Sequence, residues 1–233
     1  MENSVITKPY SIHIDISREV LDMNHDECYF TFLRRDGQTR INTLLKGFAS
    51  HLHGFASSFT NSGDIILIGK SRKDMKLAFN RMKEIGGGIV IAEKGEILFE
   101  MPLELQGVMS KASLPDLIEQ ESRMKELLAE KGYPFEDPMY SLLFFTSTHL
   151  PYLRVTQAGL YEVMNKSILC PTIMRENNKE KASMRRRSHM LKKICTFMCS
   201  TFFINDMLNI FVLKVFESCK NRIWCCLSKT AQC

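Results

Sequence analysis

The chain has 233 residues, of which 45% are hydrophobic, so it can bury a substantial core, and its formal net charge is +5. Most of the imbalance lies after Lys179, and the nearly neutral residues before it argue against nucleic-acid binding by the main part of the chain. Six of the eight cysteines also follow Lys179, so the main part needs no disulfides. The first ten residues lack the apolar run of a signal peptide, and we expect a cytoplasmic protein.

The N-terminal region, residues 1–46, is predicted to form strands that join the main sheet. Residues 10–16 alternate apolar and polar side chains, which is typical of a half-buried strand. Residues 28–33 and 39–45 are two β-prone runs, and the Asp-Gly pair between them favours a hairpin. A further short strand is expected within residues 55–59.

Residues 64–103 carry the clearest pattern and form the predicted centre of the fold. The continuous apolar run 65–68 is typical of a strand covered on both faces. Ser71 is a helix N-cap candidate, and the helix that follows ends at Gly86. The strands 89–92 and 97–99 then form a hairpin that stops at Pro102. A strand–helix–strand unit of this length predicts a right-handed parallel crossover.

After an irregular stretch, 103–110, Ser113 begins a second helix, which ends at Gly132. Its predicted buried face consists of Leu117, Ile118, Met124, Leu127 and Leu128. We expect further strands at 140–146 and 153–155, then a turn and a short helix within 157–165. The predicted fold class is α+β, with an α/β-like centre: a mixed β-sheet with the central strand–helix–strand unit and two main helices packed on it.

Residues 176–233 are predicted to form a separate basic, cysteine-rich tail, helical or disordered. Four polar residues interrupt its apolar segment, 194–216, and such residues are costly in a bilayer, so a membrane-spanning helix is not expected. The spacing of the cysteines does not match a zinc site. A tail that anchors the chain to a membrane surface or a partner, through the basic run 185–187 and the apolar segment, is one hypothesis for function.

Histidines offer the first candidate for chemistry. His51 and His53 would share one face of a strand and could then hold a metal ion together. Such a site needs more histidines from later strands, and only His149 and His189 follow. We therefore favour surface or loop histidines.

Glycine-rich stretches offer the second candidate. Gly69-Lys70-Ser71 is similar to the end of a phosphate-binding loop, but Asp64 stands where that motif requires its first glycine. A strand end followed by an N-cap explains these residues. Gly86-Gly87-Gly88 precedes a strand rather than a helix, which favours a tight turn over a phosphate site. The residues by themselves therefore indicate no catalytic constellation.

Residues 47–174 contain a series of short stretches in the order and at about the spacing of one known family. They are Gly-Phe-Ala at 47–49, Ala-Ser-Ser at 56–58, Asp-Ile-Ile-Leu-Ile-Gly at 64–69, Asp-Met at 74–75, Asn-Arg-Met at 80–82, Ile-Gly-Gly-Gly-Ile-Val at 85–90, Met-Pro-Leu at 101–103, Gly-Val-Met-Ser at 107–110, Asp-Pro at 137–138, Ser-Leu-Leu-Phe at 141–144, Leu-Arg-Val-Thr at 153–156 and Gly-Leu at 159–160. Together they resemble the C-terminal domain of microbial adenine deaminases, in the amidohydrolase superfamily. The predicted domain of this kind spans residues 47–175.

The resemblance implies a parent reaction, the hydrolysis of adenine to hypoxanthine and ammonia in purine salvage. Such enzymes use manganese or another divalent metal, held in a barrel that precedes this domain. The family often has a His-Asp-Ser-His-Asn run where this chain has residues 60–64, one residue shorter and without histidine, so any ligand-facing role of those histidines is not transferred. We expect this chain to bind no metal and to be inactive alone.

The expected partners are adenine, through the parent enzyme, and an upstream catalytic amidohydrolase domain or chain; a homo-oligomer remains open. The residues expected to face substrate or that catalytic domain, from irregular loops outside the sheet, are Ser57, Ser58, Asp64, Gly107, Met109 and Ser110. Each has an alternative role in turns or packing. Similarity to the family ends near residue 175, which suggests a split, truncated or frameshifted enzyme. A stand-alone module that binds nucleobases or other small molecules without catalysis is the alternative function.

Overall fold

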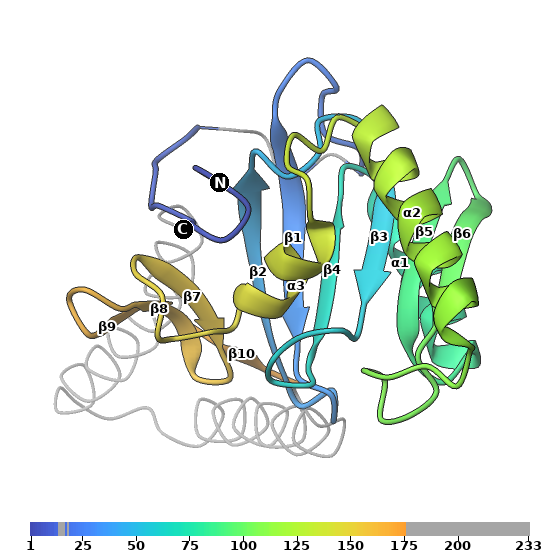
Figure 1. Cartoon of the computed structure of the whole chain (residues 1–233). Coiled ribbons are helices and arrows are strands. Elements are labelled where there is room, and N and C mark those ends of the chain that lie inside the picture. The colour runs from blue at the N-terminus through green and yellow to red at the C-terminus, as the bar shows by residue number, and fades with distance from the viewer. Residues whose placement is uncertain (14–16, 18, 176–233) are drawn as a thin grey trace, which may run out of the picture. The chain divides into compact units, whose positions relative to one another are not determined.

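The computed structural model describes residues 1–13, 17 and 19–175 (Figure 1). The chain separates into two units, Met1–Arg175 and Glu176–Cys233, and the described helices and strands belong to the first. The predictions for the tail, including its apolar segment, basic run and cysteine spacing, lie outside the described residues. Within the described residues, no helix is long and apolar enough to cross a membrane.

An N-terminal hairpin forms as predicted. Strand β1 (Glu27–Leu33) pairs along its whole length with residues 40–46 of β2 (Thr39–Lys46), and Gly37 in the connecting turn has a φ of +70°. The strand predicted at 10–16 is wrong for the residues that can be compared. Residues 10–13 have no strand structure, and Tyr10 and Ile12 are exposed, because no neighbouring strand pairs with their backbone; residues 14–16 are outside the description.

Residues 54–102 form four strands and one helix in chain order. They are β3 (Gly54–Ser57), β4 (Ile65–Gly69), α1 (Arg72–Glu84), β5 (Gly88–Glu93) and β6 (Glu96–Pro102). Strand β3 pairs antiparallel with both β4 and β5, so β4 and β5 are parallel to each other, as the crossover prediction requires. The sequence pattern did not reveal that β3 lies between them. With β10 (Ile173–Met174), the seven strands of this described sheet are ordered β10-β2-β1-β4-β3-β5-β6.

Helix α1 begins and ends at the predicted residues. The Ser71 hydroxyl accepts a hydrogen bond from the Asp74 amide at 3.2 Å, and Gly86 follows the helix with a φ of +83°. This confirms that Gly69 ends a strand and that Ser71 is an N-cap. Lys70 is buried between them and donates to the Asp22 carbonyl at 2.8 Å, so it is not presented to a ligand.

The sheet is covered on both faces, which confirms the α+β fold class. On one face, α1 packs Ala78 and Met82 against Ala56 and Val90. On the other, α2 (Leu114–Glu130) and α3 (Pro138–Phe144) lie over the larger core. Figure 1 shows α2 and α3 in front of the sheet and α1 behind it.

The helix α3 replaces the strand predicted at 140–146. A short apolar run does not distinguish a buried strand from a buried helix by its periodicity. Capping decides the outcome here, because the Asp137 side chain accepts from the Tyr140 amide at 3.1 Å and Pro138 occupies the first turn, where proline is favoured.

A three-stranded sheet follows α3. It consists of β7 (Leu153–Thr156), β8 (Gly159–Glu162) and β9 (Ser167–Pro171), in that order. The strand predicted at 153–155 is confirmed, whereas the short helix expected within 157–165 is wrong. Gly159 has a φ of +153°, and its amide donates to the Thr156 hydroxyl. This turn joins β7 and β8 in a hairpin, which takes the place of the helix.

Candidate functional site

Two polar clusters lie at opposite ends of β3. The first, which we call the Asp64 cluster, consists of Arg35, Ser58, Asp64, Gln106, Gly107 and Gln157. Asp64 precedes β4 and is buried, with one carboxylate oxygen accepting from the Arg35 amide at 3.1 Å and the other from the Gln157 side chain at 3.0 Å. It therefore joins the turn after β1, the start of β4 and the turn between β7 and β8.

The same cluster holds the loop that follows β6. The Ser58 hydroxyl accepts from the Gly88 amide at 2.8 Å and donates to the Gly107 carbonyl at 2.6 Å. Arg35 donates from Nη1 to the Gln106 carbonyl at 2.7 Å. Gln106 and Gly107 have φ values of +58° and +72°, so two consecutive left-handed residues form the turn that these side chains hold.

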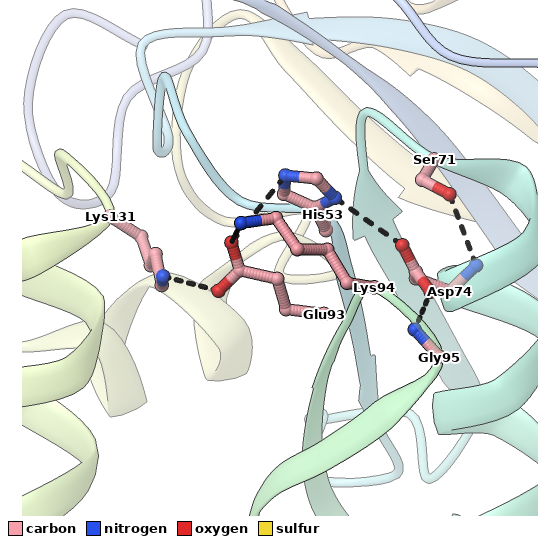
Figure 2. A network of polar contacts seen from close by, with 7 residues as sticks. All are labelled: His53, Ser71, Asp74, Glu93, Lys94, Gly95 and Lys131. Carbon is pink, nitrogen blue, oxygen red and sulfur yellow. Dashed lines mark hydrogen bonds and ion pairs between the residues drawn. The ribbon is translucent and has the colours of Figure 1, made fainter.

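The second cluster, which we call the His53 network, lies before β3 and is shown in Figure 2. His53 Nδ1 is 3.3 Å from an oxygen of Asp74, in the first turn of α1, and Nε2 is 3.6 Å from an oxygen of Glu93, at the end of β5. The other Glu93 oxygen accepts from Lys131, which follows α2. The other Asp74 oxygen accepts from the Gly95 amide at 2.9 Å.

These contacts set the charge state of both acids. Burial alone raises the pKa of Asp74, but hydrogen bonds from the Gly95 amide, Ser71 and His53 outweigh it, so the pKa of Asp74 is lowered. The hydrogen bond from Lys131 is the main cause of the lowered pKa of Glu93. Both side chains are therefore held as carboxylates.

The His53 network does not fit a metal ion. The two imidazole nitrogens face different carboxylates, and Lys131 already neutralises Glu93. Across residues 1–13, 17 and 19–175, no group of three or more His, Cys, Asp or Glu side chains is placed to hold a metal. The network instead ties β3, α1, the β5–β6 hairpin and α2 together.

Comparison with known proteins identifies the family. Residues 4–167 match the adenine deaminase C-terminal domain family. The chain belongs to this family. It is 56% identical over 175 residues to "Putative adenine deaminase YerA" of Bacillus subtilis, a match that covers 75% of this chain and 30% of that protein. It is 30% identical over 141 residues to "Adenine deaminase" of Shigella sonnei, covering 59% of this chain and 24% of that protein.

The matched region is thus a minor part of each relative. In "Adenine deaminase" of Kosmotoga olearia, at 36% identity over 110 residues, it covers 19% of the protein and 47% of this chain. The chain spans less than a third of the length of these curated relatives. Most of each relative therefore lies outside the adenine deaminase C-terminal domain described above.

The structure of this adenine deaminase C-terminal domain brings together three of the six predicted site residues. Ser58, Asp64 and Gly107 belong to the Asp64 cluster, with Arg35 as the link between them. Ser57 is not on a loop, as we expected, because it is the last residue of β3 and is fully buried. Met109 is exposed, and the Ser110 hydroxyl accepts from the nearby Ala112 amide.

Sequence reasoning named His53 as half of a rejected metal pair, but it missed the roles of Arg35, Gln106 and Gln157 in the first cluster and of Glu93 and Lys131 in the second. Arg35 and Gln157 lie in turns that carried no signal beyond turn formation. His51 is exposed, as expected for a surface histidine, but the His53 side chain is only 17% exposed and lies within the network. Both histidines lie in the loop before β3, which confirms the favoured interpretation of loop histidines over a pair on one strand face.

Acid is expected to weaken the His53 network. The pKa values of Asp74 and Glu93 lie below their ordinary values of 3.8 and 4.5 in the folded chain, so their stabilising effect is fully present above about pH 4.5 and is lost as the pH falls through the lowered values. Asp74→Asn should lower the free energy of unfolding by about 1–2 kcal/mol at neutral pH. The difference from the unsubstituted chain should shrink near about pH 3 in urea titrations.

The exposed Glu119 supplies the matched control, and Glu119→Gln should leave the pH profile unchanged. A difference between Asp74→Asn and the unsubstituted chain that persists undiminished in acid would contradict the role given to the Asp74 carboxylate.

Proposed function

We propose that this chain acts as the C-terminal domain of an adenine deaminase and takes part in the hydrolysis of adenine to hypoxanthine and ammonia in cytoplasmic purine salvage. The observation that carries the proposal is the family match over residues 4–167. Manganese or another divalent metal supplies the attacking hydroxide in this class of reaction. Because the described residues do not fit a metal, the catalytic centre is assigned to a separate domain or chain.

The hydrogen bonding of the Asp64 cluster indicates what this domain contributes. Both Asp64 oxygens accept bonds from within the domain, and the Ser58 hydroxyl both donates and accepts. Polar groups that are already hydrogen-bonded gain little free energy from a further bond to a substrate. Their existing hydrogen bonds hold the surrounding loops in one conformation. This supports an interdomain role for Ser58, Asp64 and Gly107 over direct adenine binding.

Reconstitution tests the proposal. The full chain should release no ammonia from adenine in the presence of manganese. The remaining part of the Bacillus subtilis relative, produced without the region that this chain matches, should be weakly active or unstable alone. Adding the full chain should raise hypoxanthine formation by at least about tenfold, because the two parts of the interface then come together.

Heat-denatured chain provides the control for non-specific protein effects. Turnover of adenine by the chain alone would overturn the assignment of the catalytic centre to a separate domain. Adenine binding without any effect on the partner, measured by calorimetry, would replace the proposal by a stand-alone nucleobase-binding module.

A further inference from the structure

Four large apolar side chains are exposed within one short stretch of the chain, which we call the 105–118 patch. They are Leu105, 41% exposed, Met109, 59%, Leu114, 70%, and Ile118, 56%. Single exposed apolar residues are common on protein surfaces, but exposed apolar residues that lie close together are typical of interaction sites.

The loop part of the patch is held in place before any partner binds. The Leu105 amide donates to the Met109 carbonyl at 2.9 Å, and the Met109 amide donates to the Leu105 carbonyl at 3.1 Å. Between them lie the Gln106 and Gly107 carbonyls that Arg35 and Ser58 hold from the Asp64 cluster. A surface ordered in this way loses little conformational entropy on binding.

The helical part of the patch is equally well defined. Leu114 and Ile118 are one turn apart at the start of α2 and so share a face of the helix. The Ser113 hydroxyl caps this end by accepting from the Asp116 amide at 3.4 Å, and it also donates to the Asp116 carboxylate at 2.6 Å.

The sequence pattern and the structure disagree at this turn of α2. Periodicity predicts that Ile118 is buried with Met124 and Leu128, yet only the latter two enter the core. Leu117, in the same turn, is half-buried and packs against the core, so Ile118 lies at the solvent edge of the apolar face of the helix.

We propose that the 105–118 patch docks against the metal-dependent catalytic domain of an adenine deaminase. This inference rests on the proposed function. The patch is continuous with the Asp64 cluster through residues 106 and 107, and in the Bacillus subtilis relative 70% of the protein lies outside the matched region, since the match covers 30%.

The charges beside the patch argue against a second copy of the chain as the occupant. Glu104, Asp116 and Glu119 are exposed in the same stretch, with Lys111 as its basic residue. In a twofold dimer this surface would face a second copy of itself, and because its acidic residues outnumber its basic one, the two copies would bring net negative charge together. The partner surface that fits is apolar with a basic rim.

The test uses Leu114→Gln with Ile118→Gln in the full chain, and Met164→Gln with Leu169→Gln as the matched control. The control residues are also exposed, at 64% and 46%, but lie near β9. Binding to the remaining part of the Bacillus subtilis relative is measured by calorimetry. The patch variant should raise Kd at least about tenfold, while the control retains the Kd of the unsubstituted chain.

Three further outcomes separate the hypotheses. If the unsubstituted chain neither binds nor activates the remaining part of the relative, the proposed function fails and the inference fails with it. If it binds and the patch variant binds equally well, the inference alone is overturned. If sedimentation shows that the unsubstituted chain dimerises and the patch variant does not, the occupant is a second copy and the proposal is wrong. Circular dichroism should show unchanged folding, because the substituted residues are exposed.

Discussion

Substitution of Gly54 by alanine is expected to lower the free energy of unfolding by about 3 kcal/mol or more. A Cβ atom at Gly54 would lie 2.3 Å from the Asp74 carbonyl carbon, 2.5 Å from its oxygen and 2.6 Å from the Met75 nitrogen. These are backbone atoms in the first turn of α1, which cannot rotate away as a side chain would. The helix must lift from β3, and Asp74 must then leave His53.

The measurement is urea unfolding of the full chain followed by far-ultraviolet circular dichroism. Tryptophan fluorescence is unsuitable because Trp224, the only tryptophan, lies outside the described residues. Hydrogen exchange should show lost protection in peptides from residues 72–84. Gly63→Ala is the control, since its Cβ meets nothing within 4 Å and only its φ of +70° is unfavourable. That variant should lose about 1–2 kcal/mol, and equal losses in the two variants would contradict the steric argument.

Arg154→Met is expected to be similarly severe, with a loss of about 3 kcal/mol or more. Arg154 is fully buried, and its guanidinium donates to the carbonyls of Val5 at 2.8 Å, Pro151 at 2.9 Å, Phe144 at 3.2 Å and Leu150 at 3.4 Å. Burial lowers the pKa of Arg154, because the charge is removed from water. Methionine fills much of the space but leaves these carbonyls without their donor.

Thermal unfolding and hydrogen exchange check this result. Residues 3–7 and 144–156 should lose protection first, because Arg154 joins the N-terminal segment to the end of α3 and the loop before β7. The stability of Arg154→Lys should lie between that of the unsubstituted chain and that of Arg154→Met, since one ammonium group reaches fewer carbonyls than a guanidinium does. The exposed Arg123 gives the control, Arg123→Met, and comparable stability of the Arg123 and Arg154 variants would show that the buried contacts contribute little.

Much of the secondary structure could be predicted because its signals are local. The Asp-Gly turn between β1 and β2, the Ser71 cap and the left-handed Gly86 each act on residues two to four positions away. The helix α3 shows the limit of such signals, because the apolar run alone suited a strand. Asp137 could be recognised as a helix cap in the sequence, but the sequence did not show that this cap would favour a helix over the strand that the apolar run suggested.

The polar clusters were only partly predictable, because their members are distant in sequence. Asp64 and Gln157 are 93 positions apart, and Ser58 and Gly107 are 49 apart. The family resemblance indicated Ser58, Asp64 and Gly107 as candidates without showing what each contacts. The partners Arg35 and Gln157 followed only from the arrangement of the strands.

The sequence by itself determined the family of this protein and the caps and turns that define most of its helices and strands. Caps and turns depend on residues a few positions apart, and the family is shown by similar stretches in the same order, so neither requires knowledge of the tertiary structure. Only the tertiary structure decided that β3 lies between β4 and β5, that Arg154 is buried among carbonyls and that Ile118 is exposed. Burial and strand order arise from contacts between distant segments, which no local pattern specifies.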